Sequence, residues 1–344
     1  MSHSNRFLSP SKAAKRLGVS TKALRLYEQR GLLVPVRTEA GWRTYGSAEM
    51  AQAAEIVALR TLGLSLVQVA RVLKGDPQFL EPALAAHQEA LEDRIRRLAD
   101  TVERVRGLRA DLAQGEKPKI SALARMVQPA PEISVAFDLP WPWGGERFEL
   151  RDIRPINYII GPLFSGKTRL AQTIAESLPS ASFLSLDRLA EDGTEAREQL
   201  HRDPALKARV DKAMVWLTEE GAIESPALIA LMVALESEIA TVLVVDMVET
   251  GLDHASQDAL ISYLRLRGPG ARPLFLLTRS CAILDLAAVG PDEAIILCPA
   301  NHSPPTQVAP YPGAPGYEAV ATCLATPEVR ARTEGVIAWR PEVA

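Results

Sequence analysis

The sequence predicts an α plus α/β fold, in which a helical first part precedes a second part built on a mostly parallel sheet. Three observations support this fold class. Residues 1–76 contain short helical patterns separated by tight turns. Residues 81–114 repeat apolar side chains at every seventh position, as a coiled-coil helix does. From about residue 133 to residue 300, short apolar runs alternate with helical stretches, which is the pattern of parallel strands joined by crossover helices.

The composition indicates two or three domains and an uneven distribution of charge. The chain has 344 residues, of which 47% are hydrophobic, enough for sizeable cores. Residues 1–76 hold 12 Lys and Arg against 5 Asp and Glu, a balance of +7, whereas the remainder has a balance of −10. A basic first part on an acidic body predicts a polyanionic partner for the first part alone.

The sequence also bears on the compartment of the protein. It has no signal peptide pattern and no apolar run of about 18 residues, so we expect a cytoplasmic protein without membrane contact. Cys281, Cys298 and Cys323 are widely spaced and form no CxxC motif or Cys/His cluster. We therefore expect single thiols in a reducing compartment.

The first part reads as a winged helix-turn-helix. Ser9 can cap a helix over "PSKAAKRLG", and Ser20 or Thr21 can cap a second helix over "KALRLYEQRG". About four residues separate these helices, which is a helix-turn-helix spacing. The stretch "LLVPVRTEAGWRTY" alternates like a hairpin, and "SAEMAQAAEIVALRTLG" and "SLVQVARVLKG" predict two further helices.

This arrangement predicts a surface for double-stranded DNA. A recognition helix that begins at Ser20 presents its N-terminal half to the major groove. Arginines on a hairpin wing would lie against phosphates or the edge of a minor groove. The expected DNA-binding residues are Lys12, Thr21, Lys22, Arg25, Tyr27, Arg37, Arg43 and Tyr45. A place in the core is the alternative for Tyr27, and a solvated hairpin face is the alternative for Arg43 and Tyr45.

A heptad seam predicts that residues 77–115 form a dimerisation helix. The seam consists of apolar side chains that recur at every seventh position: Leu84, Leu91, Leu98, Val105 and Leu112. Gln88, Ile95 and Val102 follow the first three of these at a distance of four positions. A helix that keeps this period for nearly five repeats predicts a homodimer. An amphipathic helix that packs on its own domain is the alternative.

The second part contains a phosphate-binding motif. "GPLFSGKT", residues 161–168, fits G-x-x-x-x-G-K-[ST] and stands between the strand "NYIIG" and the helix "KTRLAQTIAESL". The backbone N–H groups of such a loop cradle phosphates, and Lys167 would reach the β- and γ-phosphates of ATP or ADP. Thr168 and Asp246, which ends the strand "TVLVVD", would hold Mg²⁺. The expected nucleotide-binding residues of the loop are Gly161, Ser165, Gly166, Lys167 and Thr168, together with Asp246.

The first part resembles the MerR family of bacterial transcription regulators. The resemblance covers about residues 7–76 and is carried by "SPSKAAKRLGVSTKALRLYEQRGLLVPVRTEAGWRTYGSAEM". It implies a homodimer, paired through an antiparallel coiled coil, on a promoter palindrome in the bacterial nucleoid, with RNA polymerase nearby. Metal sensors of that family carry cysteines at the end of the dimerisation helix. This chain has none there, so a thiophilic metal bound in that way is not expected.

The second part resembles an ABC-type ATPase domain, with informative departures. The resemblance rests on "FELRDIRPINYIIGPLFSGKTRLAQ", "VLVVDMVETGLDHASQDALISYL" and "PLFLLTRSCAIL". Met247 replaces the catalytic Glu, Arg279 occupies the position of the switch His, and Ser225 is the one possible remnant of the LSGGQ signature. A site that lacks the groups that position and deprotonate water is expected to hydrolyse ATP slowly or not at all.

Three further residues are candidates for this site. Glu249 is the nearby carboxylate that could act as a displaced catalytic base, and a loop carboxylate or N-cap is the alternative. Trp141 and Trp143 stand where an ABC domain has an aromatic residue that stacks on adenine. A surface or linker-packing role is the alternative for both.

The predicted organisation is therefore a DNA-binding domain over residues 1–76, the dimerisation helix over 77–115, a linker over 116–132, and a nucleotide-binding domain with a Pro-rich tail over 133–344. The expected function is transcription regulation, in which the nucleotide state alters promoter DNA geometry. Two alternatives remain: a DNA-maintenance ATPase that the first domain targets, and a small-molecule kinase in which Asp187 would act as base.

Overall fold

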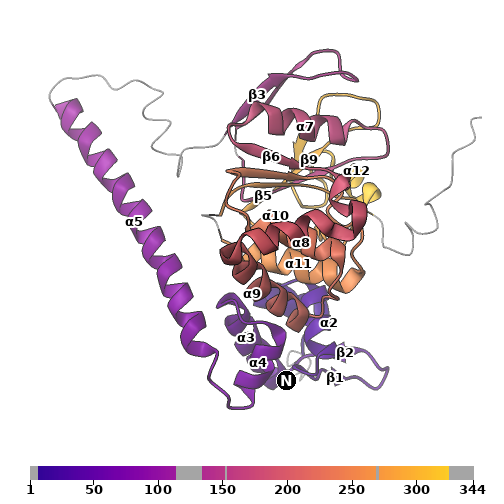
Figure 1. The fold of residues 1–344 in the computed structure, drawn as a ribbon. Coiled ribbons are helices and arrows are strands. Elements are labelled where there is room, and N and C mark those ends of the chain that lie inside the picture. The colour runs from indigo at the N-terminus through magenta and orange to yellow at the C-terminus, as the bar shows by residue number, and fades with distance from the viewer. Residues whose placement is uncertain (1–6, 114–133, 152, 269–270, 325–344) are drawn as a thin grey trace, which may run out of the picture. The chain divides into compact units, whose positions relative to one another are not determined.

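The computed structural model describes residues 7–113, 134–151, 153–268 and 271–324 (Figure 1). The chain divides into two compact units, and the boundary falls between Ile133 and Ser134. The predicted linker lies outside the described residues. No helix within the described ranges is long and apolar enough to cross a membrane.

The first unit is helical, as its sequence predicts, and local signals set its helix ends. Ser20 caps α2 by accepting a hydrogen bond from the backbone N–H of Ala23 at 3.1 Å. Gly18 ends α1 in the left-handed conformation, at φ 70°. The elements are α1 (Pro10–Leu17), α2 (Thr21–Gln29), β1 (Val36–Arg37), β2 (Arg43–Thr44), α3 (Ser47–Thr61), α4 (Leu66–Leu73) and α5 (Leu80–Ala113).

A short hairpin and a small core complete this unit. Strands β1 and β2 pair antiparallel, with Val36 opposite Thr44. The N-terminal segment adds a single bridge between Leu8 and Tyr45. Helices α1 to α4 pack around fully buried side chains such as Leu24, Ile56 and Val69.

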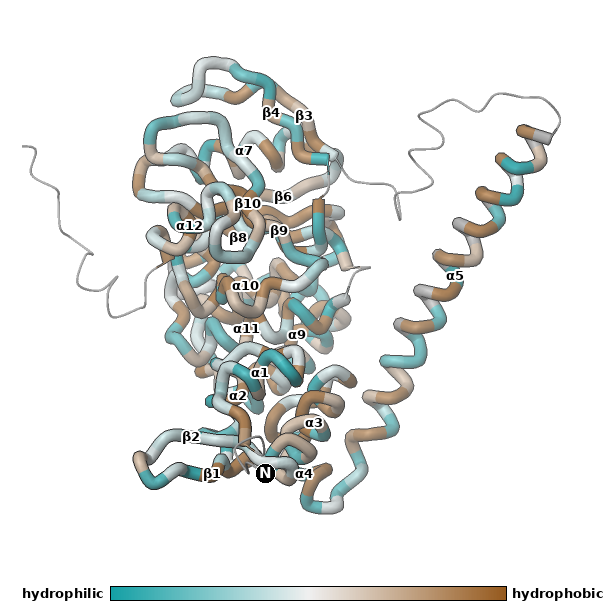
Figure 2. Tube along the Cα trace, turned by 180° about the vertical axis from the view of Figure 1, so that it is seen from behind, coloured by the Kyte–Doolittle hydropathy of each residue, from teal (hydrophilic) through white to brown (hydrophobic). Residues whose placement is uncertain are grey.

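Helix α5 is 34 residues long and covers the predicted heptad seam. Its apolar seam side chains are between 41% and 63% exposed: Leu84, Leu91, Ile95, Leu98, Val102, Val105 and Leu112. Figure 2 shows hydrophobic positions, in brown, recurring along the whole length of α5. A seam that stays in solvent does not pack on its own unit, which is the alternative that the sequence left open.

The second unit is built on a six-stranded sheet, and the predicted parallel strands are confirmed. The strand order is β10-β9-β5-β8-β7-β6. All neighbours pair parallel except β10, which pairs antiparallel with β9. The strands are β5 (Ile156–Ile160), β6 (Ala181–Leu184), β7 (Val242–Val245), β8 (Leu274–Leu277), β9 (Glu293–Leu297) and β10 (Thr306–Val308).

Helices cover both faces of this sheet. Helix α7 (Lys167–Ser177) lies on one face, and α10 (Pro226–Glu236) and α11 (His254–Leu266) lie on the other (Figures 1 and 2). The remaining elements are β3 (Val135–Asp138), β4 (Arg147–Leu150), the 3₁₀ segment η2 (Leu186–Gly193), α8 (Thr194–Arg202), α9 (Pro204–Glu220) and α12 (Tyr317–Cys323). The Pro-rich tail contains the edge strand β10.

Candidate functional site

A basic recess in the first unit brings together five of the eight predicted DNA-binding residues. The recess has a volume of about 240 Å³ and is lined by Pro10, Thr21, Lys22, Arg25, Arg43 and Tyr45. Helix α2 supplies Thr21, Lys22 and Arg25 from its first turns, and the hairpin supplies Arg43 and Tyr45. Three cationic side chains around one recess fit the anionic backbone of a nucleic acid.

Glu28 holds the hairpin against α2. The Arg43 guanidinium donates to Oε2 of Glu28 at 2.9 Å, and the Tyr45 hydroxyl donates to Oε1 of the same carboxylate. The hydrogen bond with Glu28 raises the pKa of Arg43, and burial raises the pKa of Tyr45. Sequence reasoning missed Glu28, because an acidic side chain on a DNA-facing helix looks unfavourable until its two partners are known.

The other predicted DNA-binding residues occupy different environments. Lys12 is exposed on α1, and Arg37 is exposed on β1, where its guanidinium donates to the carbonyl oxygen of Gly41 at 3.0 Å. Tyr27 is only 5% exposed and belongs to the core, three positions after Leu24 on the inner face of α2. This burial favours the core position that the sequence offered as the alternative, and a DNA contact of Tyr27 stays a prediction.

Tyr45 lines the recess but is almost fully buried, and its DNA contact stays a prediction. Its side chain is 1% exposed, so its ring lies beneath the recess and not on an open surface. Because its hydroxyl donates to Glu28, Tyr45 fixes the hairpin and does not offer a free phenol to a ligand.

In the second unit, the loop from β5 to α7 is shaped by two glycines. A side-chain Cβ at Gly161 would lie 2.3 Å from the carbonyl oxygen of Cys298. At Gly166, which has φ 86°, a Cβ would lie 2.6 Å from the indole of Trp143. Close approach of the backbone at both positions therefore requires glycine. Within the described residues, the buried hydroxyl of Ser165 has no hydrogen-bond partner.

Lys167, Thr168 and Asp246 come together as the motif predicts. The Lys167 ammonium donates to the carbonyl oxygen of Pro162 at 2.6 Å, and burial lowers its pKa. The Thr168 hydroxyl lies 3.3 Å from the nearer carboxylate oxygen of Asp246. Burial raises the pKa of Asp246, more than the hydrogen bond from Thr168 lowers it. A buried carboxylate with a raised pKa favours a nearby cation.

Arg188 organises the turn after β7, and sequence reasoning missed it. Its guanidinium donates to the carbonyl oxygens of Ser185, Asp246 and Met247, at 2.9, 2.7 and 2.8 Å. Met247 has φ 43°, in the left-handed region that a non-glycine residue rarely adopts. The adjacent Asp187 is exposed and accepts a hydrogen bond from the Ser185 hydroxyl at 2.7 Å.

Glu249 and Trp143 are buried, whereas Trp141 is exposed. Glu249 is 3% exposed, and its Oε1 accepts a hydrogen bond from the backbone N–H of Arg279 at 2.9 Å. This buried position favours a structural carboxylate over a displaced catalytic base. Trp143 is 5% exposed and supports Gly166, so it offers no free ring face to adenine. Trp141 is 84% exposed, and its stacking on adenine stays a prediction.

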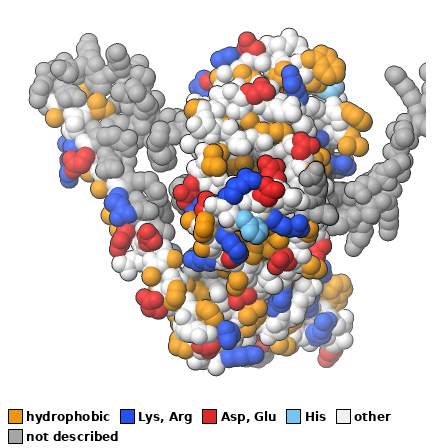
Figure 3. Space-filling view, viewed as in Figure 1, with side chains coloured by type: hydrophobic (Ala, Val, Ile, Leu, Met, Phe, Trp, Pro, Cys, Tyr) orange, Lys and Arg blue, Asp and Glu red, His pale blue; other side chains and the backbone are white. Residues whose placement is uncertain are grey.

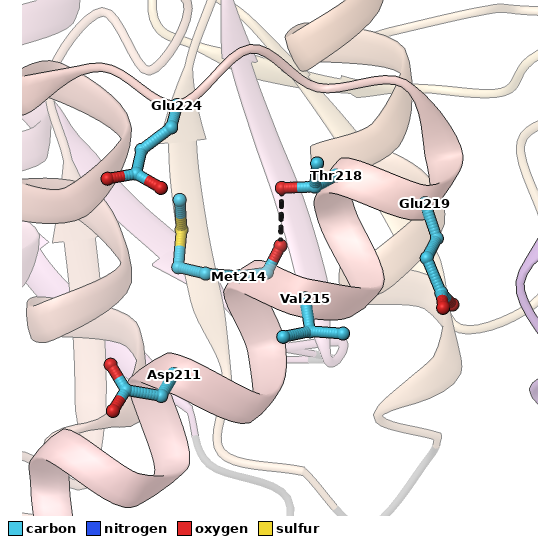
Figure 4. A pocket seen from close by; sticks show the side chains of 6 residues that line it. All are labelled: Asp211, Met214, Val215, Thr218, Glu219 and Glu224. Atoms are coloured by element: carbon cyan, nitrogen blue, oxygen red, sulfur yellow. Dashed lines mark hydrogen bonds between the residues drawn. The ribbon is translucent and has the colours of Figure 1, made fainter.

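An apolar groove on α9 is a separate feature. It is lined by Asp211, Met214, Val215, Thr218, Glu219 and Glu224 (Figure 4). None of these residues belongs to the predicted nucleotide site. Acidic and basic side chains are interspersed over the visible face of this unit (Figure 3). On α9, Lys207 and Asp211 form an ion pair at 2.5 Å. The groove is therefore separate from the phosphate-loop site.

Comparison with known proteins identifies relatives of the first unit. Residues 8–76 match the family described as MerR HTH family regulatory protein. A "Probable heavy metal-dependent transcriptional regulator" of Haemophilus influenzae is 34% identical over 102 residues, which make up 28% of this chain and 80% of that protein.

Two solved structures are similar at low TM-scores. The crystal structure of HiNmlR, a MerR family regulator lacking the sensor domain and bound to promoter DNA, has a TM-score of 0.27 and 21% identity, covering 32% of this chain and 96% of that one. An inward-facing conformation of a putative metal-chelate type ABC transporter has a TM-score of 0.36 and 15% identity, covering 52% of this chain and 84% of that one.

Proposed function

This chain belongs to the MerR family and is a DNA-binding transcription regulator, and we propose that its second unit is an ATP-binding effector domain. In this proposal, Mg²⁺ accompanies the nucleotide, and nucleotide occupancy changes how a homodimer holds promoter DNA. ATP or ADP is the ligand class, because the loop motif binds the phosphates of either.

The phosphate loop is the observation that carries the proposal. Gly161 and Gly166 leave room only for backbone, and the buried Ser165 hydroxyl is unsatisfied within the described residues. A helix N-terminus follows directly at Lys167, and its N–H groups and dipole favour an anion. These features fit a phosphate group better than they fit a structural turn.

Thr168 and Asp246 fit a magnesium site of the kind that uses few protein ligands. Magnesium in nucleotide sites is held by one or two protein oxygens together with phosphate oxygens and water. Such an ion, when bound, neutralises charge on the phosphates. The hydroxyl of Thr168 and the carboxylate of Asp246 already lie within 3.5 Å of each other, so neither must move far to share one ion.

The groups that surround this site support slow ATP hydrolysis or no hydrolysis. Met247 offers no carboxylate, and Glu249 is buried against the backbone of Arg279. Losing a group that deprotonates water costs about two to four powers of ten in rate. Occupancy alone suffices for a sensor, because a ligand that binds two states of a protein differently shifts their populations.

The exposed seam of α5 supports the proposed homodimer. Seven large apolar side chains on one helix stay between 41% and 63% exposed in the single chain. A second copy of the same helix would cover them by coiled-coil packing. A dimer with two recognition helices would read a palindromic promoter, and RNA polymerase would act on the same DNA.

A phosphate-release assay on the full chain, with and without duplex DNA, tests this function. The sensor predicts measurable ATP binding with near-zero release of phosphate. Turnover stimulated by DNA would contradict it and support a DNA-maintenance ATPase. Formation of ADP that depends on an added small-molecule hydroxyl compound would contradict it and support a kinase that uses Asp187.

A further inference from the structure

The groove on α9 presents apolar side chains to solvent. It has a volume of about 500 Å³, and five of its six lining residues lie on α9, whereas Glu224 comes from the segment that follows this helix (Figure 4). Met214 and Val215 form its apolar part. Val215 is 61% exposed, and Ile223, next to Glu224 in the chain, is 64% exposed. Exposed apolar side chains with a polar rim are typical of a surface that binds another protein.

The rim of the groove is acidic. Asp211, Glu219 and Glu224 line it, and among the described residues no Lys or Arg side chain does so. Asp211 forms its ion pair with Lys207 on the exposed surface, where such a pair contributes little to stability, so Asp211 can exchange Lys207 for the cation of a partner. Three carboxylates beside an apolar floor repel DNA and favour a partner that carries both positive charge and apolar side chains.

Hydrogen bonds hold both walls of the groove in place. The backbone N–H of Ile223, next to Glu224, donates to the hydroxyl of the buried Ser256 on α11 at 2.9 Å. On the α9 side, the Thr218 hydroxyl donates to the carbonyl oxygen of Met214 at 2.8 Å (Figure 4). A surface that is fixed before a partner arrives loses little conformational entropy on binding, so the groove is suited to docking.

We propose that the α9 groove is the docking surface for a basic amphipathic helix of a partner protein. Asp211, Val215 and Glu219 stand four positions apart, so they follow one face of α9 over two turns, a length that suits another helix. Apolar side chains of the partner helix fill the groove beside Met214 and Val215. Its Lys and Arg side chains lay their apolar stems along the groove and bring their charges to the rim carboxylates.

Fluorescence anisotropy of a labelled synthetic helix with the full chain tests the proposal. The probe repeats Leu-Lys-Lys-Leu-Leu-Lys-Leu, which puts leucines on one helix face and lysines on the other, and the control peptide has Glu in place of each Lys. We expect saturable binding of the basic peptide alone. Val215→Lys should weaken it by about 10-fold or more, as the loss of an interface anchor does. The matched control, Ile239→Lys, adds the same charge at an apolar position that is 84% exposed outside the groove, and should change the affinity by less than about twofold.

The acidic rim gives a second comparison. Glu224→Gln should weaken binding of the basic peptide by about two- to fivefold at low salt and by less at high salt. Glu195→Gln removes the same charge from an exposed position on α8 and should leave the affinity unchanged.

Three results would overturn the proposal. The first is the absence of saturable binding, or equal binding of the acidic peptide. The second is an equal affinity of Val215→Lys and Ile239→Lys, which would reduce the binding to general attraction between charges; if thermal unfolding shows that the lysine disturbs the fold, Val215→Ser replaces it in this comparison with Ile239→Ser. The third is a Val215→Lys variant that becomes monomeric in sedimentation, because a second copy of the chain would then be the occupant of the groove.

Discussion

Glu28→Gln separates two physical accounts of the DNA-binding recess. The substitution removes one negative charge and keeps the size of the side chain. If only net charge governs DNA binding, a less acidic recess should bind DNA more tightly. If Glu28 acts by fixing Arg43 and Tyr45, the same change should weaken binding, because both partners lose their anchor.

The magnitude follows from the two hydrogen bonds that the carboxylate accepts. Hydrogen bonds to a charged group contribute about 1.5–3 kcal/mol, against about 0.5–1.5 kcal/mol for neutral ones. Arg43 and Glu28 keep 27% and 13% of their side chains exposed, so solvent screens part of the effect. We expect a loss of about 2 kcal/mol, which lowers the melting temperature of a unit of this size by roughly 4–16 °C.

Two measurements on the full chain check this prediction. Scanning calorimetry follows the unfolding of the first unit, and fluorescence anisotropy follows binding to a duplex at one fixed salt concentration. We expect Glu28→Gln to weaken DNA binding by roughly 3- to 10-fold through lost preorganisation. Glu39→Gln is the control, because it removes the same charge from an exposed hairpin position. Equal or tighter DNA binding by Glu28→Gln than by Glu39→Gln would refute the anchoring account.

Three further predictions concern the seam of α5, the missing catalytic carboxylate at Met247, and the cysteine thiols. Leu98→Asp puts a charge in the exposed seam of α5 and should give monomers in analytical ultracentrifugation; a variant that stays dimeric would show that another surface holds the pair. Met247→Glu restores a carboxylate after Asp246 and should raise ATP turnover above the wild-type rate, whereas ordinary wild-type turnover that is lost in Glu249→Gln would show that the catalytic base has moved. Cys298 is fully buried and burial raises its pKa to about 12, so an alkylating reagent at pH 8 should modify it far more slowly than the partly exposed Cys281; equal rates would contradict the packing of Cys298 beside Gly161.

The sequence was sufficient for the elements whose signals are local. Apolar runs such as "TVLVVD" and "PLFLLT" became buried parallel strands, because such runs can be satisfied only between helical layers. The juxtaposition of Thr168 and Asp246 was also predictable, since the loop motif and the strand end meet at the same edge of a parallel sheet.

Contacts between distant residues were beyond the reach of the sequence. Arg188 binds carbonyl groups 58 and 59 positions away, and no local pattern reports such a pair. Tyr27 lies on the core face of α2, whereas Arg25, two positions earlier, is exposed. The sequence of one short helix does not decide which of these side chains faces the core. Trp143 packs on Gly166 where β3 approaches α7, and this contact depends on the assembled fold.

The central claim is that nucleotide occupancy of the second unit changes how the protein holds DNA. The most direct test measures the DNA affinity and DNA bend angle of the full chain with and without a saturating non-hydrolysable ATP analogue. Allosteric coupling of about 1–3 kcal/mol predicts a change of about 5- to 150-fold in affinity, or a shift in bend angle, for the wild type and for Lys212→Ala, an exposed control. Lys167→Ala should show neither. An analogue that binds the wild type and leaves both affinity and bend angle unchanged would contradict the claim.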